Sequence, residues 1–395
     1  MEIKYIGPKE LYTSTLYTES TIEECLEWLH TLSMVSLDTE TQGLFDHKNH
    51  IVMLQLYDNL SDVAFVIDVR QQSIMPLKER LESIIVLGQN LKFDYKFLKL
   101  HGIELNYIYD TLLGEAILTT GVEDRRLNLK HLVKKYCDVE LSKEQQTSFV
   151  GMSNEPFTEA QIVYGIKDVT YLHKIRDKQL EELTKLDLLN LVKLEMETCL
   201  VLGDIEYNGF GLNVDKWKEL AKKALINVNT YQLELDSLAK SEPNLQQFIL
   251  KKVQGNLFEG IEEGYTRERD VNIKWTSAKQ TLKVFKELGL PVDKANEKIL
   301  SKFQNNYPLV KKFIDFKKQT KLTTTYGTKF LDNINSVTGR IHTEFWQILN
   351  TGRISSGNKN SKGAPNMQNL PANNDYRNCF IPAEGNKIVS CDFSG

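Results

Sequence analysis

The chain of 395 residues lacks several features that would place it in a membrane, secreted or zinc-binding class. It contains no run of about 18 apolar residues, so no membrane-spanning helix and no membrane partner are expected. The N-terminal residues 1–5 have neither the basic nor the apolar region of a signal peptide. We therefore predict a soluble globular protein of the cytoplasm.

Cysteines are few and scattered, and no CxxC pair occurs. A disulfide framework needs an even set at regular spacings and a zinc site needs close pairs, so neither is expected. The five cysteines are Cys25, Cys137, Cys199, Cys379 and Cys391. With 41% hydrophobic residues, a chain of this length can bury two or three domain cores.

The net charge of −4 conceals an asymmetry along the chain. Residues 305–395 contain 12 Lys and Arg against 6 Asp and Glu, which leaves about −10 for the first 304 residues. A basic C-terminal part suits a polyanionic partner. A solvated helix face explains the lysines of residues 311–321 equally well.

Two acids follow an apolar segment near the N-terminus, in Met34-Val-Ser-Leu-Asp38-Thr-Glu40. In a strand, the i, i+2 spacing puts Asp38 and Glu40 on one face. Such a pair in isolation is usually two solvated acids at the mouth of a loop. Further carboxylates later in the chain favour a cation site instead.

The surrounding pattern predicts an α/β domain with a mixed sheet. Segments 34–40, 50–57 and 63–68 are expected to form an antiparallel meander, and 84–90 a further strand before a helix at 92–101. Strands followed by strand–helix alternation give a mixed sheet flanked by helices. Asp38, Glu40 and Asn90 fall at strand ends, where functional groups gather.

Two more acids lie in predicted helices. Asp94 is in the first turn after Asn90, where a helix-dipole role is common. Tyr164 and Asp168 share one face of a helix predicted over 158–185, since they are spaced i, i+4. Four carboxylates without histidine or cysteine suit Mg²⁺ or Mn²⁺, and two such ions clamp the oxygens of a phosphodiester during hydrolysis. Tyr164 would orient the attacking water.

In order and spacing, these segments resemble the three exonuclease motifs of the DEDD superfamily, in the tyrosine subgroup found in family A DNA polymerases and ribonuclease D-type enzymes. The resemblance implies a ribonuclease H-like fold in which Asp38, Glu40, Asp94 and Asp168 bind two metal ions and Tyr164 positions water. The block Asn90-Leu-Lys-Phe-Asp94 carries the second motif.

The same resemblance assigns roles to three further positions. Asn90 corresponds to a DNA-contacting position. Leu44 matches a position where family members wedge an apolar side chain against the 3′-terminal base, although core packing explains Leu44 about as well. Asp110 matches a recurrent family position and is interpreted as a helix N-cap.

Residues 186–350 are predicted to be long helices with an irregular, exposed segment at 254–275. Helices are expected from 188 to 205, from a cap at Asp215 to about 240, from 277 to 289, and from 308 to 333. This region resembles the thumb of family A DNA polymerases. The match is carried by Ser277-Ala-Lys-Gln280, Leu288-Gly-Leu-Pro291 and Val337-Thr-Gly-Arg340-Ile-His342.

The last 45 residues resemble the start of the polymerase palm. Thr351-Gly-Arg353-Ile-Ser-Ser356 and Pro365-Asn366-Met-Gln368-Asn369-Leu-Pro371 look like one split motif, and Ile388-Val-Ser-Cys-Asp392 like the strand with the first catalytic aspartate. A polymerase checks the primer end through minor-groove acceptors present on every base pair. The resemblance implies such contacts from four residues and metal binding by a fifth. The contacts are from Arg353, Asn366, Gln368 and Asn369; the metal ligand is Asp392.

Two departures from the family pattern limit what carries over. The link between Ser356 and Pro365 is several residues longer than usual, and Gly395 stands where the family usually has Gln. Because one palm carboxylate cannot hold two metal ions, polymerisation is expected to need a second, C-terminal polypeptide, as in a naturally divided polymerase of a phage.

These patterns together predict an exonuclease domain at 1–186, a helical thumb at 187–345 and an incomplete palm at 346–395. The expected function is Mg²⁺-dependent removal of 3′-terminal nucleotides from DNA, in a bacterial or phage-infected cell. Two alternatives stay open. One is a stand-alone ribonuclease D-like enzyme, which leaves residues 353–392 unexplained, and the other is a non-catalytic DNA-binding subunit.

Overall fold

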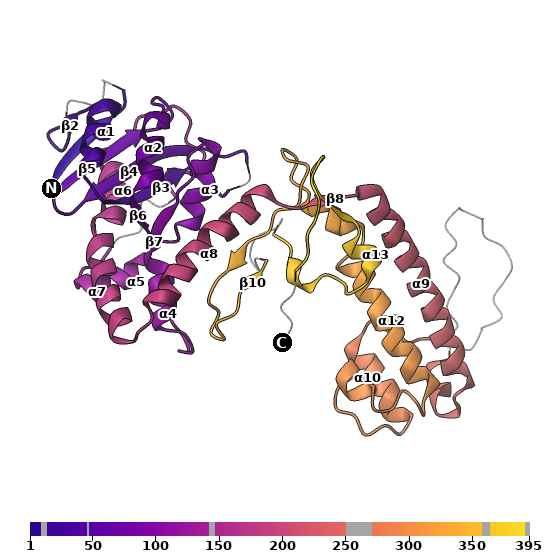
Figure 1. Ribbon diagram of the computed structural model, residues 1–395. Helices are drawn as coiled ribbons and strands as arrows, with labels where there is room; N and C mark the ends of the chain where they lie inside the picture. Colours follow the sequence, from indigo (N-terminus) through magenta and orange to yellow (C-terminus); the bar gives the residue numbers. More distant parts are fainter. Residues whose placement is uncertain (9–13, 46, 142–146, 250–270, 358–363, 392–395) are drawn as a thin grey trace. The chain divides into compact units, whose positions relative to one another are not determined.

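The computed structural model describes residues 1–8, 14–45, 47–141, 147–249, 271–357 and 364–391. Within these ranges the chain forms two compact units (Figure 1). The first contains Met1–Phe210 and Ile334–Asn369, and the second Gly211–Asn333 and Leu370–Gly395. No helix of the described residues has the length and apolarity needed to cross a bilayer.

A seven-stranded mixed sheet forms the centre of the first unit, in the order β2-β1-β5-β4-β3-β6-β7. Its strands are β1 (Glu2–Ile6), β2 (Thr18–Glu19), β3 (Met34–Thr41), β4 (Ile51–Asp58), β5 (Val63–Asp68), β6 (Ile85–Gly88) and β7 (Tyr107–Asp110). The expected meander is present, because β4 pairs antiparallel with both β3 and β5. Strands β6 and β1 then join it in parallel.

Helices cover this sheet and supply most of its apolar partners. They are α1 (Ile22–His30), α2 (Lys78–Ser83), α3 (Lys92–Leu100), α4 (Thr111–Leu118), α5 (Leu129–Cys137), α6 (Glu159–Thr170), α7 (Leu172–Lys185) and α8 (Leu189–Asn208), with the 3₁₀ turn η2 (Met75–Leu77). The single helix predicted over 158–185 is wrong, since it is two helices that meet at Tyr171. The β-branched and aromatic run Val169-Thr170-Tyr171 has low helix propensity.

The first unit also holds a later part of the chain. Residues 334–369 contribute the two-stranded pair β9 (Phe345–Trp346) and β10 (Ser355–Ser356), followed by the 3₁₀ turn η5 (Met367–Asn369). Phe210 exchanges backbone hydrogen bonds with Ile341, at 2.7 and 2.9 Å. Segments more than a hundred residues apart therefore belong to one folded body.

The second unit is mainly helical. It contains α9 (Val214–Ser241), α10 (Ala278–Glu287), α11 (Glu297–Leu300), α12 (Pro308–Thr324), α13 (Asn374–Arg377), η3 (Pro243–Phe248), η4 (Thr328–Asn333) and the strand pair β8 (Gly211–Leu212) with β11 (Phe380–Ile381). Helices α9 and α12 run side by side (Figure 1). Buried aromatic rings, including Trp275, Phe285 and Phe313, fill the core between the helices.

Three sequence expectations for this unit need correction. Asn213, not Asp215, caps α9, by accepting a hydrogen bond from the backbone N–H of Lys216. The helix predicted over 308–333 ends at Thr324, because a run of threonines and Gly327 disfavours its continuation. The expected tip at 254–275 lies largely outside the described residues, and in its last part Val271, Ile273 and Trp275 are buried.

The functional division into residues 1–186, 187–345 and 346–395 stays a prediction. The compact units follow packing, and packing places α8 and residues 334–369 with the sheet. The mixed α/β fold class predicted from the sequence is confirmed by this architecture.

Candidate functional site

Strand β3 carries Asp38 and Glu40 to one face of the sheet. The two residues alternate with the buried Leu37 and Thr39, as a strand period of two requires. Both acids are partly buried. On the neighbouring strand, Gln55 pairs directly with Asp38.

Helix α6 brings the third acid to this face. Thr158 caps the helix in a reciprocal capping box with Gln161, which fixes where the helix begins. Asp168 then lies beside the two acids of β3, and carboxylate oxygens of Asp38, Glu40 and Asp168 lie within 4.8 Å of one another. Three of the four acids predicted from the sequence are thus brought together by a strand and a helix 130 residues later.

Asp94, on α3, lies near Asp38 and Glu40, but it is not among the three acids whose oxygens lie within 4.8 Å of one another. Its Oδ1 accepts hydrogen bonds from the backbone N–H and the hydroxyl of Thr39, at 3.1 and 2.5 Å. Since Thr39 stands between the two acids of β3, this contact fixes α3 against the strand.

Burial and the crowding of carboxylates raise the pKa values of the acids in this site. Burial, with the Asp94, Asp168 and Glu40 carboxylates nearby, raises the pKa of Asp38 well above its ordinary range. Burial and the charges of Asp168 and Asp94 raise the pKa of Glu40 to about 9. Burial raises the pKa of Asp94 to about 7, although the hydrogen bonds from Thr39 oppose that rise.

The donor set fits a hard divalent cation. Oxygen ligands are those that Mg²⁺ and Mn²⁺ prefer, and neither histidine nor cysteine belongs to the cluster. A cation would offset the mutual repulsion that raises these pKa values. The described residues therefore suit divalent metal, as predicted from the sequence.

Tyr164 lies on α6, one turn before Asp168. Burial and the Asp168 and Glu40 carboxylates raise the pKa of its phenol. The phenol therefore keeps its proton at neutral pH, and it offers one donor and an acceptor. Its ring is partly exposed and borders a pocket.

A pocket of about 520 Å³ opens beside the acids. Its lining comes from β3 and the end of β7, from the segments around residues 89–92, 112–113 and 125–130, from α6 and from the later segment around Trp346, all within the first unit. Polar or charged lining residues outside the acid cluster include Gln89, Asn90, Lys92, Arg125, Asn128, Lys130 and Gln347. An elongated polar ligand that reached Asp38 and Asp168 would meet these groups.

Asn90 is exposed at the rim of this pocket and has a positive φ of 62°. The buried Asp110 holds its turn, because the carboxylate accepts the backbone N–H groups of Asn90 and Leu91 at 2.9 and 2.8 Å. Asp110 also caps α4, as expected, through the N–H of Leu112. One carboxylate therefore sets both the loop and the helix that border the pocket.

Leu44 is 72% exposed on the segment that follows β3. Core packing, the alternative explanation for this leucine, is wrong. Leu44 does not line the pocket itself.

The four predicted primer-template residues are all exposed and none lines the pocket. Asn366 accepts the backbone N–H groups of Gln368 and Asn369 through its Oδ1, at 3.0 and 3.1 Å. Gln368 accepts from Ser356 N and donates to Ile354 O, at 3.0 and 3.3 Å. Two of the four side chains thus shape their own loop.

Arg353 differs from these amides. Its guanidinium forms no ion pair or side-chain hydrogen bond with the described residues and projects from the turn between β9 and β10. Asp392, the predicted palm ligand, lies outside the described residues.

A buried ion-pair network behind the site was missed by sequence reasoning. Glu206 of α8 binds Lys92 and Lys96 of α3, at 2.5 and 2.6 Å, and accepts the backbone N–H of Phe345 at 2.6 Å. The i, i+4 spacing of Lys92 and Lys96 indicates only that these two lysines share one face of a helix. Nothing in the sequence joins partners separated by more than a hundred residues.

Two family descriptions match the chain. Residues 13–184 match a 3′-5′ exonuclease family and residues 245–395 match DNA polymerase family A. The POL domain of Pol1 from M. smegmatis, in complex with DNA primer-template and dNTP, shares the fold. Its TM-score is 0.68 at 19% identity, over 97% of this chain and 59% of that one.

Curated relatives align along nearly the whole chain. DNA polymerase I of Aquifex aeolicus is 29% identical over 384 residues, and that of Synechocystis sp. is 26% identical over 424 residues. The alignments cover 95% and 99% of this chain but 60% and 39% of the relatives. The two family matches and these relatives agree that the chain belongs to DNA polymerase family A and carries a 3′-5′ exonuclease domain.

Proposed function

We propose that this chain hydrolyses 3′-terminal nucleotides of DNA with two divalent metal ions, as the proofreading part of a family A DNA polymerase. The observation that carries the proposal is the trio Asp38, Glu40 and Asp168, whose oxygens lie within 4.8 Å of one another. Tyr164 on the same helix as Asp168 gives the trio a partner for water. The match of residues 13–184 to a 3′-5′ exonuclease family supports the assignment.

The carboxylates of Asp38, Glu40, Asp94 and Asp168 would hold the ions. Bound Mg²⁺ or Mn²⁺ supplies a water of lowered pKa and charge stabilisation at a phosphodiester. The protein contributes by holding these acids in position. Thr39 and the capping box of α6 fix the acids on three separate elements before any ligand arrives.

Tyr164 acts through orientation in this proposal. Its raised pKa disfavours a phenolate, so the phenol is a poor general base. As a protonated group beside Asp168 and Glu40 it donates one hydrogen bond and accepts another, which is sufficient to aim a water molecule.

The DNA strand entering the site would lie in the 520 Å³ pocket. Arg125 and Lys130 would supply positive charge for phosphates, while Asn90 would supply an amide donor. Trp346, which also lines the pocket and is 48% exposed, presents a ring on which a base can stack. None of these contacts selects a sequence, as proofreading requires.

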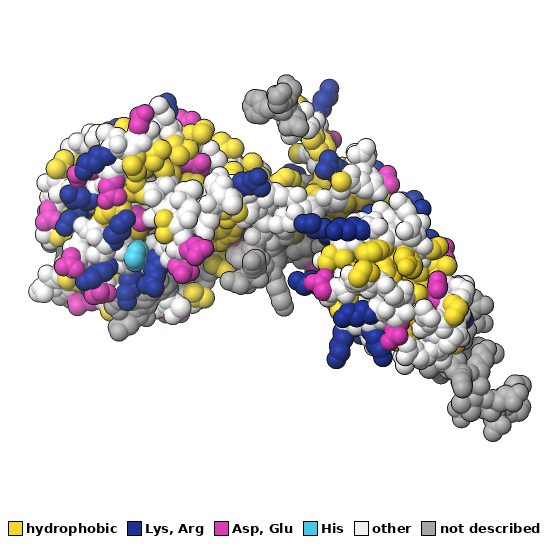
Figure 2. Space-filling model, turned by 90° about the horizontal axis from the view of Figure 1, so that it is seen from below, with side chains coloured by type: hydrophobic (Ala, Val, Ile, Leu, Met, Phe, Trp, Pro, Cys, Tyr) yellow, Lys and Arg dark blue, Asp and Glu magenta, His cyan; other side chains and the backbone are white. Residues whose placement is uncertain are grey.

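Exposed Leu44 would separate the last base from its template by apolar contact. Arg353, Asn366, Gln368 and Asn369 would contact the primer-template, with Arg353 as the strongest candidate because its guanidinium is exposed. Exposed lysines of α12 support binding of a polyanion, and Figure 2 shows basic side chains gathered on the second unit. Two lysines of α12, Lys312 and Lys318, already pair with Glu234 and Glu297.

Polymerisation would need more than these residues. The chain spans 60% of the Aquifex aeolicus relative, and only Asp392 corresponds to a palm metal ligand. We propose that a further polypeptide segment of the polymerase, in a separate chain or in the same one, supplies the remaining catalytic groups.

The test is degradation of a 5′-labelled DNA primer, matched or mismatched on its template, with Mg²⁺ or with EDTA. We expect stepwise shortening from the 3′ end that needs metal and disappears in Asp38→Ala. Faster shortening of the mismatched primer would support proofreading. No shortening by the folded protein with metal would refute the proposal, and preferential shortening of an RNA oligonucleotide would favour a ribonuclease D-like role.

A further inference from the structure

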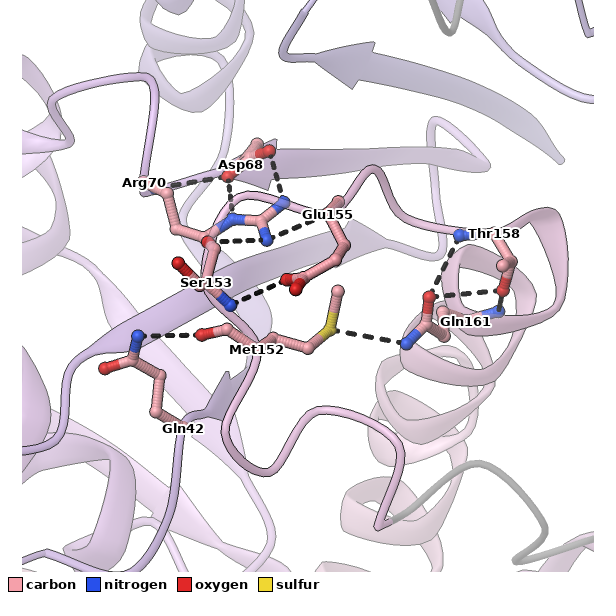
Figure 3. Close-up of polar contacts among 8 residues, drawn as sticks. All are labelled: Gln42, Asp68, Arg70, Met152, Ser153, Glu155, Thr158 and Gln161. Carbon is pink, nitrogen blue, oxygen red and sulfur yellow. Dashed lines mark hydrogen bonds and ion pairs between the residues drawn. The ribbon is translucent and has the colours of Figure 1, made fainter.

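Residues 147–158, here called the strap, lead into α6 along the side of the sheet. Figure 3 shows how polar contacts fasten the strap to the ends of two strands and to the first turn of the helix. The strap carries none of the residues assigned to catalysis. Its attachments nevertheless determine where α6, with Tyr164, begins.

Arg70 is the anchor on one side of the strap. It follows β5 and forms a two-point contact with Asp68, from Nε at 2.9 Å and Nη2 at 2.8 Å. The Asp68 side chain is fully buried and that of Arg70 is 8% exposed. A buried bidentate pair of this kind holds the guanidinium plane in one orientation.

The same guanidinium also forms hydrogen bonds with the backbone of the strap. Its Nη1 donates to the carbonyl oxygens of Ser153 and Glu155, at 3.1 and 2.9 Å. The strap is therefore bound through two backbone carbonyls by one side chain (Figure 3). Lysine could keep the charge opposite Asp68 but lacks the planar fork that reaches both carbonyls.

The strap is also tied to β3, the strand of the catalytic acids. Gln42, two residues after Glu40, donates from Nε2 to the carbonyl of Met152 at 2.8 Å (Figure 3). The N–H of Gly151 donates to the carbonyl of Gln42 at 2.9 Å. These bonds put the strap in direct register with the end of β3.

Contacts at the far end of the strap fix α6. Gln161, buried in the first turn, accepts the backbone N–H of Thr158 at 2.9 Å and donates to the hydroxyl of Ser148 at 3.0 Å. It also lies 3.4 Å from the sulfur of Met152. A shift of the strap would therefore move the start of the helix.

Aromatic packing links Arg70 to the site by a second route. The guanidinium lies 4.2 Å from the ring centroid of Phe157, which lies 6.2 Å from that of Phe149. The Phe149 ring lies 6.3 Å from that of Tyr164. Phe149 and Phe157 are 1% and 2% exposed, so neither has space to absorb a displacement.

We propose that Arg70 is a positioning residue for Tyr164, acting through the strap and through Phe157 and Phe149. The inference rests on the proposed function, in which Tyr164 orients the attacking water. Arg70 contacts none of the four acids of the candidate site and does not line the pocket. Its effect is therefore on geometry and not on ligand binding.

Arg70→Lys is the variant to test, since it keeps a cation beside buried Asp68 and preserves the fold. Arg80→Lys is the matched control. Arg80 also binds two backbone carbonyls, of Leu29 at 3.0 Å and of Leu32, but these lie on α1 and its end, not on the strap. Phe157→Leu, which leaves Arg70 and Asp68 intact, tests the aromatic route separately.

Two readouts distinguish position from general damage. The first is kcat and KM on a single-stranded oligonucleotide with Mg²⁺. The second is the ¹⁹F resonance of Tyr164 in metal-free protein labelled with 3-fluorotyrosine, assigned by its loss in Tyr164→Phe. The resonance reports on α6 even if the protein hydrolyses no DNA, so failure of the proposed function stays separate from failure of this inference.

For Arg70→Lys we expect a kcat about tenfold lower with an unchanged KM, because displacements of ~1 Å cost on the order of 100-fold in rate. The Tyr164 resonance should shift or broaden, as it should in Phe157→Leu, and Arg80→Lys should match the wild type in both readouts. An unmoved Tyr164 resonance in Arg70→Lys would overturn the proposal, whatever the rate. A moved resonance with unchanged kcat would refute the catalytic role.

Discussion

Thr39 binds a single oxygen of Asp94 twice, through its backbone N–H at 3.1 Å and its hydroxyl at 2.5 Å. Since Asp38 and Glu40 flank Thr39, the acids of β3 and the acid of α3 are joined by one residue. Thr39 alternates with the two acids along β3, yet its side chain still supports the site. Asp38 and Glu40 carry the negative charge, and Thr39 holds Asp94 of α3 near them.

Thr39→Val should weaken metal binding without removing a ligand. The valine keeps the shape and the backbone N–H but loses the hydroxyl that stabilises ionised Asp94, so the pKa of Asp94 should rise further. We expect roughly tenfold weaker Mn²⁺ binding, the usual order for a residue that supports a ligand. Mn²⁺ titration by electron paramagnetic resonance measures it, and Thr39→Ser, which keeps the hydroxyl, should bind as the wild type does.

The stability of the metal-free protein should fall as pH rises. The pKa values of Asp94 and Glu40 are raised from 3.8 to about 7 and from 4.5 to about 9, so the folded state binds more protons than the unfolded state across that interval. Stability from these groups is then full at low pH and is lost as pH rises through the folded pKa values. Thermal melting in EDTA between pH 5 and pH 9 should show a declining Tm.

Mg²⁺ should flatten this pH dependence, because a bound cation favours the ionised carboxylates. Asp38→Asn should raise the metal-free Tm near pH 8 by removing one of the crowded charges, and it should abolish the response to Mg²⁺. A Tm that rises with pH in EDTA would contradict the assigned crowding.

The acids could be found from the sequence because each lies in a local pattern with a period. Three local patterns show which way these side chains point even when the fold is unknown. They are an i, i+2 pair after an apolar strand, an acid in the first turn of a helix and an i, i+4 pair on a helix face. Leu44 could not be settled in this way. Its exposure of 72% depends on what the rest of the chain covers.

Partners of the buried charges could not be predicted for a related reason. Asp68, Lys96 and Glu206 are types that are seldom buried, and each becomes buried only because its partner arrives from elsewhere in the fold. The pair Lys96–Glu206 spans 110 residues. No pattern within one segment contains that information, so the strap and the ion-pair network emerge only from the folded structure.

Gly165 permits the close approach of α6 to the sheet, and Gly165→Ala should be harmful. A Cβ at this position would lie 2.4 Å from Nε2 of Gln55 and 3.0 Å from its Cδ and Cγ. Gln55 is fully buried and cannot swing away. We expect a lower Tm and a lower kcat, even though alanine has the higher helix propensity, by about 1 kcal/mol.

The double variant Gly165→Ala/Gln55→Ala provides the control for that clash. The amide of Gln55 has no hydrogen-bond partner among the described residues, so truncating it breaks no hydrogen bond that they make. The double variant should regain Tm and kcat relative to Gly165→Ala. If Gln55→Ala does not rescue, contact with this side chain is not the cause.

Glu206→Gln should destabilise the first unit. It leaves Lys92 and Lys96 without their buried counter-ion, a loss that typically costs about 3–5 kcal/mol. Denaturant unfolding followed by fluorescence measures the change. Glu197→Gln is the matched control, because Glu197 is on the same helix but is 62% exposed and lies 3.9 Å from Lys193; it should change stability by less than about 1 kcal/mol.

Leu44→Ser should separate strand melting from hydrolysis. The leucine is exposed, so its replacement should leave the Tm within about a degree of the wild type, as for other surface substitutions. Excision from a matched duplex end should fall several-fold, because the apolar contact with the terminal base is lost, whereas excision from single-stranded DNA should be unchanged. The two rates, measured on the same labelled strand with and without its template, provide the comparison. Equal losses on both substrates would place Leu44 in the hydrolytic step, and no loss on either would remove it from DNA contact altogether.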